Sequence, residues 1–203
     1  MVGDFGFIAK TNNGKIDQCV IDGNIKSSAV TSTNNGIISN IIIKGNIGHT
    51  ATATAYSSVS GICDTNNGTI NNVYIAANIT STSKHSSAIA AFACVSNNGV
   101  IQNVFATGNM SVRAAVSGSI DGYSRVYITY LYSDSESGYY NCYTSNQSSI
   151  NSSLYTDGVS IENLQNLNFI KFGKYVDENN LLLNPDNVWV DVEGDYPKLF
   201  WEE

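Results

Sequence analysis

The aromatic residues are the part of this chain whose type and spacing most suggest a binding site. Among the 203 residues are 12 tyrosines. Seven of them lie within residues 123–143, where Tyr127, Tyr130 and Tyr132 follow one another at intervals of two or three. A tyrosine joins an apolar ring to a polar hydroxyl, so it is common both on binding surfaces and in ordinary sheets. We expect this cluster to lie on strands and to contribute to ligand binding, with a purely structural role as the alternative.

Residues suited to acid–base, nucleophilic or metal chemistry are sparse. His49 and His85 have no further metal-ligand types near them, so we predict no metal site and no cofactor. Polysaccharide-degrading enzymes need clustered carboxylates together with a proton-transferring base. The best group of this kind consists of Arg113, Arg125, Asp121 and Asp134. Ordinary surface charge accounts for that group, so we predict no catalytic residue and no enzyme.

The composition excludes several classes of protein. Only 13% of the residues are charged and the net charge is -7, which disfavours nucleic acid and anionic membranes as partners. Hydrophobic residues make up 42%, enough for a core. No apolar run approaches the roughly 18–20 residues that span a bilayer, so no membrane insertion is expected. The first residues lack the pattern of a signal peptide, and a chain trimmed from a longer protein would also lack it.

An internal repeat must position these residues. Four Asn-Asn-Gly triplets contain the pairs Asn13-Gly14, Asn35-Gly36, Asn67-Gly68 and Asn98-Gly99. Aligned on the glycine, β-branched or other apolar residues recur two, five, seven and eleven positions later. The column two positions on, for example, is Ile16, Ile38, Ile70 and Ile101. A degenerate fifth copy, with its register off by one, is found at residues 137–142.

The repeat predicts an all-β fold, a parallel β-helix of about five coils. Alternating β-branched residues are typical of strands, and one short-strand repeat can bury its apolar face only against further copies. Residues at the same position of successive repeats would then stack directly above one another. We expect the triplets to form turns in the left-handed backbone region and their asparagines to form ladders. Two more ladders are expected, one at Asn24, Asn46, Asn78 and Asn109, the other at Asn40, Asn72 and Asn103 with Gln18 below.

Residues 6–25 and 62–73 resemble the GLUG repeat of bacterial surface proteins. The family pattern is roughly apolar-apolar-G-x-N-x-G-x-I-x-N-C/V-x-x-x-G-x-V, and residues 186–201 resemble its usual ending. This chain replaces the mid-motif glycine by Lys10, Ser32, Asp64 or Val95. The resemblance covers about 130 residues and, with the general chirality of L-residues, implies a right-handed coil. It implies a secreted or cell-surface, adhesin-like protein without a catalytic motif.

A column on the opposite face of the expected strands suggests where a ligand would bind. Six positions after each glycine lie Val20, Ile42, Tyr74, Phe105 and Tyr143. If the residues five and seven positions on point inward, this column points outward. We predict a ligand surface for Tyr74, Phe105 and Tyr143, suited to sugar rings. Burial under the C-terminal segment and a protein interface are the alternatives.

The cysteines and the ends of the repeat array complete the predictions. Cys63 and Cys94 share a column, where they form either small buried side chains or a disulfide. Residues 1–153 are predicted to form the repeats and residues 154–203 a capping segment with a short helix at 160–167. We expect a monomeric, non-catalytic extracellular module that recognises a glycan or a host surface protein. A structural stalk is the close alternative, and a polysaccharide-degrading enzyme a more distant one.

Overall fold

The computed structural model describes residues 8–51, 57–83, 88–114, 126–129, 139–144, 150–151, 189–190 and 198–202. Within these ranges the chain is all-β, which confirms the predicted fold class, and it contains no helix. None of these segments therefore includes a helix that could cross a membrane. The helix predicted at residues 160–167 lies outside the described ranges.

Each repeat contributes two to four strands. The first two repeats form β1 (Ala9–Asn12), β2 (Lys15–Ile25), β3 (Thr31–Asn34) and β4 (Ile37–Ala51). The third forms β5 (Ser57–Ser60), β6 (Cys63–Asn66), β7 (Thr69–Ile75) and β8 (Asn78–Ser83). The fourth forms β9 (Ala88–Ala91), β10 (Cys94–Asn97), β11 (Val100–Ala106) and β12 (Met110–Ala114). Shorter strands follow: β13 (Val126–Thr129), β14 (Tyr139–Thr144), β15 (Ile150–Asn151), β16 (Trp189–Val190) and β17 (Lys198–Leu199).

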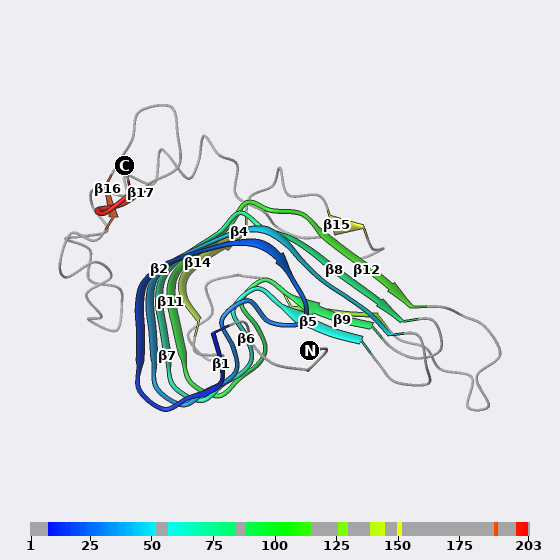
Figure 1. Ribbon diagram of the computed structural model, residues 1–203, viewed down its shortest axis with the longest axis horizontal. Coiled ribbons are helices and arrows are strands. Elements are labelled where there is room, and N and C mark those ends of the chain that lie inside the picture. The colour runs from blue at the N-terminus through cyan, green and yellow to red at the C-terminus, as the bar shows by residue number, and fades with distance from the viewer. Residues whose placement is uncertain are drawn as a thin grey trace.

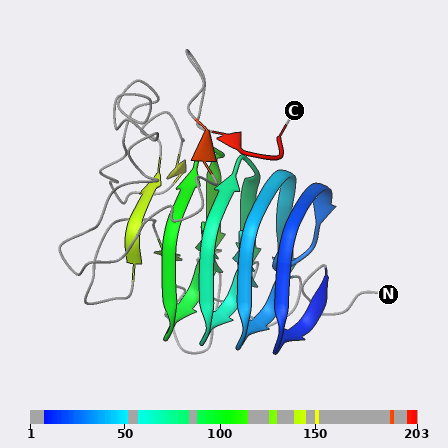
Figure 2. The same cartoon turned by 90° about the vertical axis from the view of Figure 1, so that its left-hand side faces the viewer.

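The strands form three parallel sheets and one small antiparallel pair. A four-stranded sheet has the order β1-β3-β6-β10, and a three-stranded sheet has the order β13-β9-β5. The eight-stranded sheet follows β14-β11-β7-β4-β8-β12-β15, with β2 paired to β4. Equivalent strands of successive repeats lie side by side, and the sheets surround a common interior (Figure 1). Figure 2 shows the row β2, β4, β7, β11 and β14 face on. This arrangement is compatible with the predicted β-helix.

The register between strands confirms the columns of the repeat. Ile38 pairs with Ile16 on one side and with Ile70 on the other, and Ile70 pairs with Ile101. The degenerate fifth copy follows the same rule, because Tyr139 pairs with Ile101. A slip by one residue would turn every apolar side chain outward, so burial of one face specifies this register.

The core is a stack of isoleucines and smaller apolar residues. Ile38, Ile41 and Ile43 of β4 are fully buried, and so are their partners in β7 and β11. Burying one such side chain contributes about 1.5–3 kcal/mol, so each added repeat stabilises its neighbours. The first repeat differs, because its Ile16 and Cys19 are only partly buried against this core.

The corners of the sheets correct one prediction. Left-handed residues recur in one column, at Gln18, Asn40, Asn72 and Asn103, with φ of 51°, 55°, 53° and 53°, and Ser27 also has a positive φ of 78°. The Asn-Asn-Gly triplets, predicted to be left-handed, show no positive φ. They bend with Gly14 N donating to Asn12 Oδ1 at 3.1 Å, an Asx-type turn. Their glycine is needed for another reason: a Cβ at Gly36 would clash with the carbonyl oxygen of Gly14 in the preceding repeat.

Candidate functional site

The outward column of the sequence lies on the outer face of the eight-stranded sheet. Val20, Ile42, Tyr74, Phe105 and Tyr143 pair in register along β2, β4, β7, β11 and β14. We call this column the outer row. Ile42 lies between Ile41 and Ile43, which both belong to the hydrophobic core, while Ile42 itself does not. The strand alternates, so the outer row points away from the core.

Exposure varies strongly along the outer row. Val20 is 55% exposed, whereas Ile42 and Phe105 are 0% and 2% exposed although neither belongs to the core cluster. Tyr74 lies between these extremes, and its hydroxyl is 2.9 Å from the Thr107 hydroxyl. Part of the outer row is therefore covered, and Tyr74 is its partly accessible aromatic residue.

The other tyrosines predicted to bind are described only in part. Tyr127 lies on β13, paired with Ile89, and Tyr143 pairs with Phe105. Their side chains, like that of Arg113 on β12, lie outside what the structure describes. The remaining predicted candidates fall in undescribed ranges: Tyr130, Tyr132, His85, Asp121, Arg125 and Asp134.

The asparagine ladders predicted from the triplets are present. In the inner ladder, Asn12 Nδ2 donates to Asn34 Oδ1, Asn34 to Asn66 and Asn66 to Asn97, each at 2.8 Å. Asn34 and Asn66 are fully buried, and each also receives the N–H of the glycine two residues on. This ladder satisfies buried amides that would otherwise destabilise the turn.

Two exposed ladders run in the opposite direction. Asn35 Nδ2 donates to Asn13 Oδ1 at 2.9 Å, Asn67 donates to Asn35 and Asn98 to Asn67. The other ladder is formed by Asn46 donating to Asn24, Asn78 to Asn46 and Asn109 to Asn78. Both expose rows of amide groups along the stack, the first at the triplets and the second on β2, β4 and β8.

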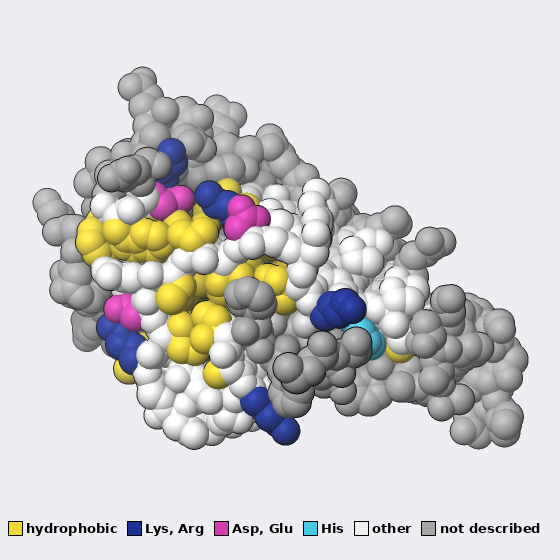
Figure 3. Space-filling view, in the orientation of Figure 1, with side chains coloured by type: hydrophobic (Ala, Val, Ile, Leu, Met, Phe, Trp, Pro, Cys, Tyr) yellow, Lys and Arg dark blue, Asp and Glu magenta, His cyan; other side chains and the backbone are white. Residues whose placement is uncertain are grey.

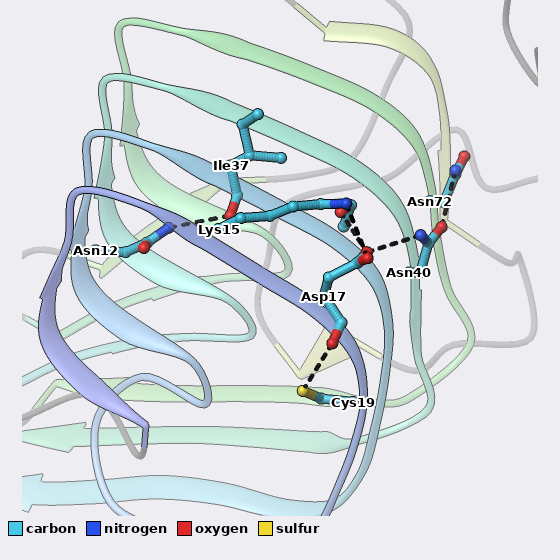
Figure 4. A network of polar contacts seen from close by, with 8 residues as sticks. Asn12, Lys15, Asp17, Cys19, Ile37, Asn40 and Asn72 are labelled. Atoms are coloured by element: carbon cyan, nitrogen blue, oxygen red, sulfur yellow. Dashed lines mark hydrogen bonds and ion pairs between the residues drawn. The ribbon is translucent and has the colours of Figure 1, made fainter.

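The corner ladder ends on a carboxylate that the sequence did not single out. Asn103 donates to Asn72 at 3.0 Å and Asn72 to Asn40 at 3.1 Å. Asn40 then donates to Asp17 Oδ1 at 2.8 Å, and not to Gln18 as the column predicted (Figure 4). Ser39 Oγ donates to the same oxygen at 2.6 Å, and Lys15 Nζ lies 2.8 Å from Asp17 Oδ2.

These contacts set the ionisation of Asp17. Burial raises the pKa of its carboxyl, but hydrogen bonds from Lys15, Ser39 and Asn40 outweigh this effect and lower the pKa below its ordinary value. Asp17 is therefore ionised at neutral pH and can accept several charge-assisted hydrogen bonds at once. Its position three residues after Gly14 holds an acid only in the first repeat, which was the one signal available in the sequence.

Two hydroxyl clusters also escaped the sequence analysis. Ser28 donates to Asp64 Oδ1 at 2.8 Å, and Ser60 donates to Ser28 at 2.8 Å. At the far end of β4, His49 Nδ1 is 3.1 Å from Ser57 Oγ, which also receives the Ser81 hydroxyl at 2.8 Å. The serines of both clusters are fully buried, so their hydroxyls are not accessible as nucleophiles.

The cysteine column is confirmed as a pair of buried thiols. Cys63 and Cys94 are direct register partners, fully buried and not joined by a disulfide. Hydrogen bonding to Cys94 and burial raise the pKa of the Cys63 thiol well above its ordinary value. A protonated, buried thiol is a poor nucleophile. The described residues contain no cluster of three His, Cys, Asp or Glu residues that could hold a metal ion.

Comparisons with known proteins do not extend this description. No protein-family model matches the chain, and searches of curated proteins and of solved structures find no similar protein. The similarity to the GLUG pattern therefore rests on the repeat residues alone.

Proposed function

We propose that this chain is a non-catalytic binding module built on a right-handed parallel β-helix of the GLUG type. It acts outside the cell or at its surface, in an adhesin-like manner, and recognises a glycan or a host surface protein. The observation that carries the proposal is the outer row, an apolar and aromatic column on the face of the sheet that points away from the core. Exposed apolar patches often mark binding sites, and Tyr74 offers a partly accessible ring at the centre of this row.

The regular spacing of the stack supports a glycan as the ligand. Parallel neighbours repeat at about 4.8 Å, so side chains of successive repeats form a rigid surface that needs no ordering on binding. An aromatic ring packs well against the apolar face of a sugar, and hydroxyls and amides beside it can bind the sugar's hydroxyls. Thr107, within hydrogen-bonding distance of Tyr74, lies in such a position.

A glycan array of the purified chain tests the proposal with a matched pair of variants. Tyr74→Phe keeps the ring and removes the hydroxyl, whereas Tyr74→Ser removes the ring, and circular dichroism checks the folding of both. We expect binding that Tyr74→Phe largely retains and that Tyr74→Ser weakens by about 10-fold or more, since an aromatic contact is lost. Absence of binding by the wild type, or equal binding by a folded Tyr74→Ser, would contradict a glycan site on the outer row.

A structural stalk is the second candidate, and the burial of Ile42 and Phe105 favours it. Side chains that are 0% and 2% exposed cannot contact a ligand unless the residues that cover them move away. Both views place the β16–β17 pair outside the large sheet, near the ends of its strands (Figures 1 and 2). A stalk predicts that no surface substitution affects binding to anything, and the same array distinguishes the two functions.

A further inference from the structure

The N-terminal side of the stack presents open strand edges. Among the described strands, β1 pairs only with β3 and β2 pairs only with β4. Figure 2 shows β2 as the last of the large strands on this side. The edge of β2 is 11 residues long, and an unpaired edge carries backbone donors and acceptors available to another strand.

Apolar side chains accompany this open edge. Ile16 and Cys19 of β2 are partly buried, while their partners Ile38 and Ile41 in the next repeat are fully buried. Hydrophobic side chains gather on this face around β2 (Figure 3). The first repeat therefore carries the same inward residues as the others but lacks a neighbour on one side within the described chain.

Gly14 identifies the kind of neighbour that fits there. In the three later triplets, a Cβ on Gly36, Gly68 or Gly99 would clash with the carbonyl oxygen of the preceding triplet's glycine. A Cβ on Gly14 would meet nothing within 4 Å, and its φ is not left-handed. Neither space nor backbone conformation in this structure requires glycine at position 14. A further triplet stacked on this side would require it.

The asparagines of the first triplet point to the same neighbour. Asn34 Oδ1 accepts both Gly36 N and the side-chain amide of Asn12 from the preceding repeat. Asn12 Oδ1 accepts Gly14 N, and the described chain gives it no amide donor from a preceding repeat. In the exposed ladder the direction is reversed, and Asn13 accepts from Asn35 while its own amide has no acceptor among the described residues.

We propose that the edge formed by β1 and β2 is a docking surface for one further Asn-Asn-Gly repeat, presented by a partner chain that is not a second copy of this one. The repeat docks in the same parallel register, with its glycine against Gly14 and its inner asparagine donating to Asn12 Oδ1. Its apolar residues two and five positions after the glycine cover the partly buried Ile16 and Cys19. Strand addition to an open edge of this kind gains affinity from backbone hydrogen bonds and specificity from alternate side chains.

A peptide with the sequence of residues 27–47, which contains one complete repeat, tests the proposal on the full chain. We expect saturable binding of the labelled peptide by fluorescence anisotropy, together with slower amide exchange in β2. Gly14→Ala should leave the fold intact, because its Cβ has open space, and weaken binding by about 10-fold or more through a clash with the docked glycine. Thr80→Ala, an exposed change in β8, is the matched control and should bind like the wild type. Equal binding by Gly14→Ala and the wild type would overturn the proposal.

A chain with the same repeat fused before Ile8 provides the second measurement, since a covalent link raises the effective concentration of a weakly binding segment. In the fused chain, Gly14→Ala should lower the melting temperature, whereas in the original chain it should not. Equal shifts in the two chains would overturn the proposal. Wild-type dimers that Gly14→Ala abolishes in sedimentation would also overturn it, because they would make a second copy of this chain the occupant.

Discussion

The side-chain amide of Asn40 donates to the carboxylate of Asp17 at 2.8 Å, so the corner ladder of Asn103, Asn72 and Asn40 ends on a negative charge. Each asparagine above it, Asn72 and then Asn103, donates toward the N-terminal side. Because each asparagine donates its amide to the residue on its N-terminal side, the last residue of the ladder must accept a hydrogen bond. A residue without an amide suits that place, since it leaves no donor unpaired. Asp17 meets that need, and Lys15 partly balances its charge. The acid is thus a structural end-group of the stack.

Replacing Asp17 by asparagine should change how stability depends on pH. Because the pKa of Asp17 is lowered in the folded state, its ionised form stabilises the protein above its unfolded pKa. That contribution is lost as the pH falls through the folded pKa, below about 4. We expect urea denaturation to find wild type more stable than Asp17→Asn at pH 7, with the difference shrinking toward pH 2. A difference that stays constant over this range would contradict the role of the charge.

Two adjacent asparagines of one triplet belong to different ladders: Asn66 to the inner ladder and Asn67 to the exposed ladder of the triplets. Asn66 is fully buried, donating to Asn97 and accepting from Asn34, whereas Asn67 is exposed. Asn66→Ala leaves buried partners unsatisfied and should lower the free energy of unfolding by about 2–4 kcal/mol. Asn67→Ala should lower it by about 0.5 kcal/mol or less. Chemical denaturation measures both, and similar losses would show that the ladders are not distinct in environment.

The left-handed corner predicts an unusual order of two substitutions. At Asn72, with φ of 53°, alanine retains the steric cost of the left-handed region and glycine does not. Asn72→Gly should therefore be more stable than Asn72→Ala by about 1 kcal/mol. At the neighbouring Asn71, which is not left-handed, the order should reverse, because glycine loses more backbone entropy. Thermal denaturation measures the stability of all four variants. The same order of glycine and alanine at both positions would argue against a left-handed backbone at Asn72.

The covered part of the outer row can be tested by its effect on stability. Phe105 is 2% exposed, so Phe105→Ala should cost about 3 kcal/mol or more. Val20, in the same column, is 55% exposed, and Val20→Ala should cost less than about 1 kcal/mol. Unfolding free energies give the comparison directly. A small loss at Phe105 would mean that its cover is not maintained in solution.

The stacking columns could be predicted from the sequence because their residues repeat. Aligning the triplet glycines places Ile16, Ile38, Ile70 and Ile101 in one column, and parallel pairing follows from the burial of that column. The conformation of the triplets could not be predicted in this way. Asn and Gly are compatible with both a left-handed turn and a close approach of two backbones, and only the distance between neighbouring repeats decides between them.

The candidate site was predicted less completely, because its features depend on single residues. Alternation placed Tyr74 and Phe105 on the outer face, but periodicity does not say what covers that face. Asp17 could not be recognised as the end of a ladder from its type, since an isolated acid is usually surface charge. The Ser28–Asp64 and His49–Ser57 contacts join positions that do not repeat, so no column contains them.

The same substitution at two triplet glycines tests the stacked register most directly. Gly36 and Gly14 both follow Asn-Asn, but only a Cβ at Gly36 would clash with a neighbouring backbone. We predict that Gly36→Ala lowers the free energy of unfolding by about 3 kcal/mol. Gly14→Ala should change it by no more than about 0.5 kcal/mol. Urea denaturation of the two variants beside the wild type gives the answer, and equal losses at the two positions would contradict the stack of triplet on triplet.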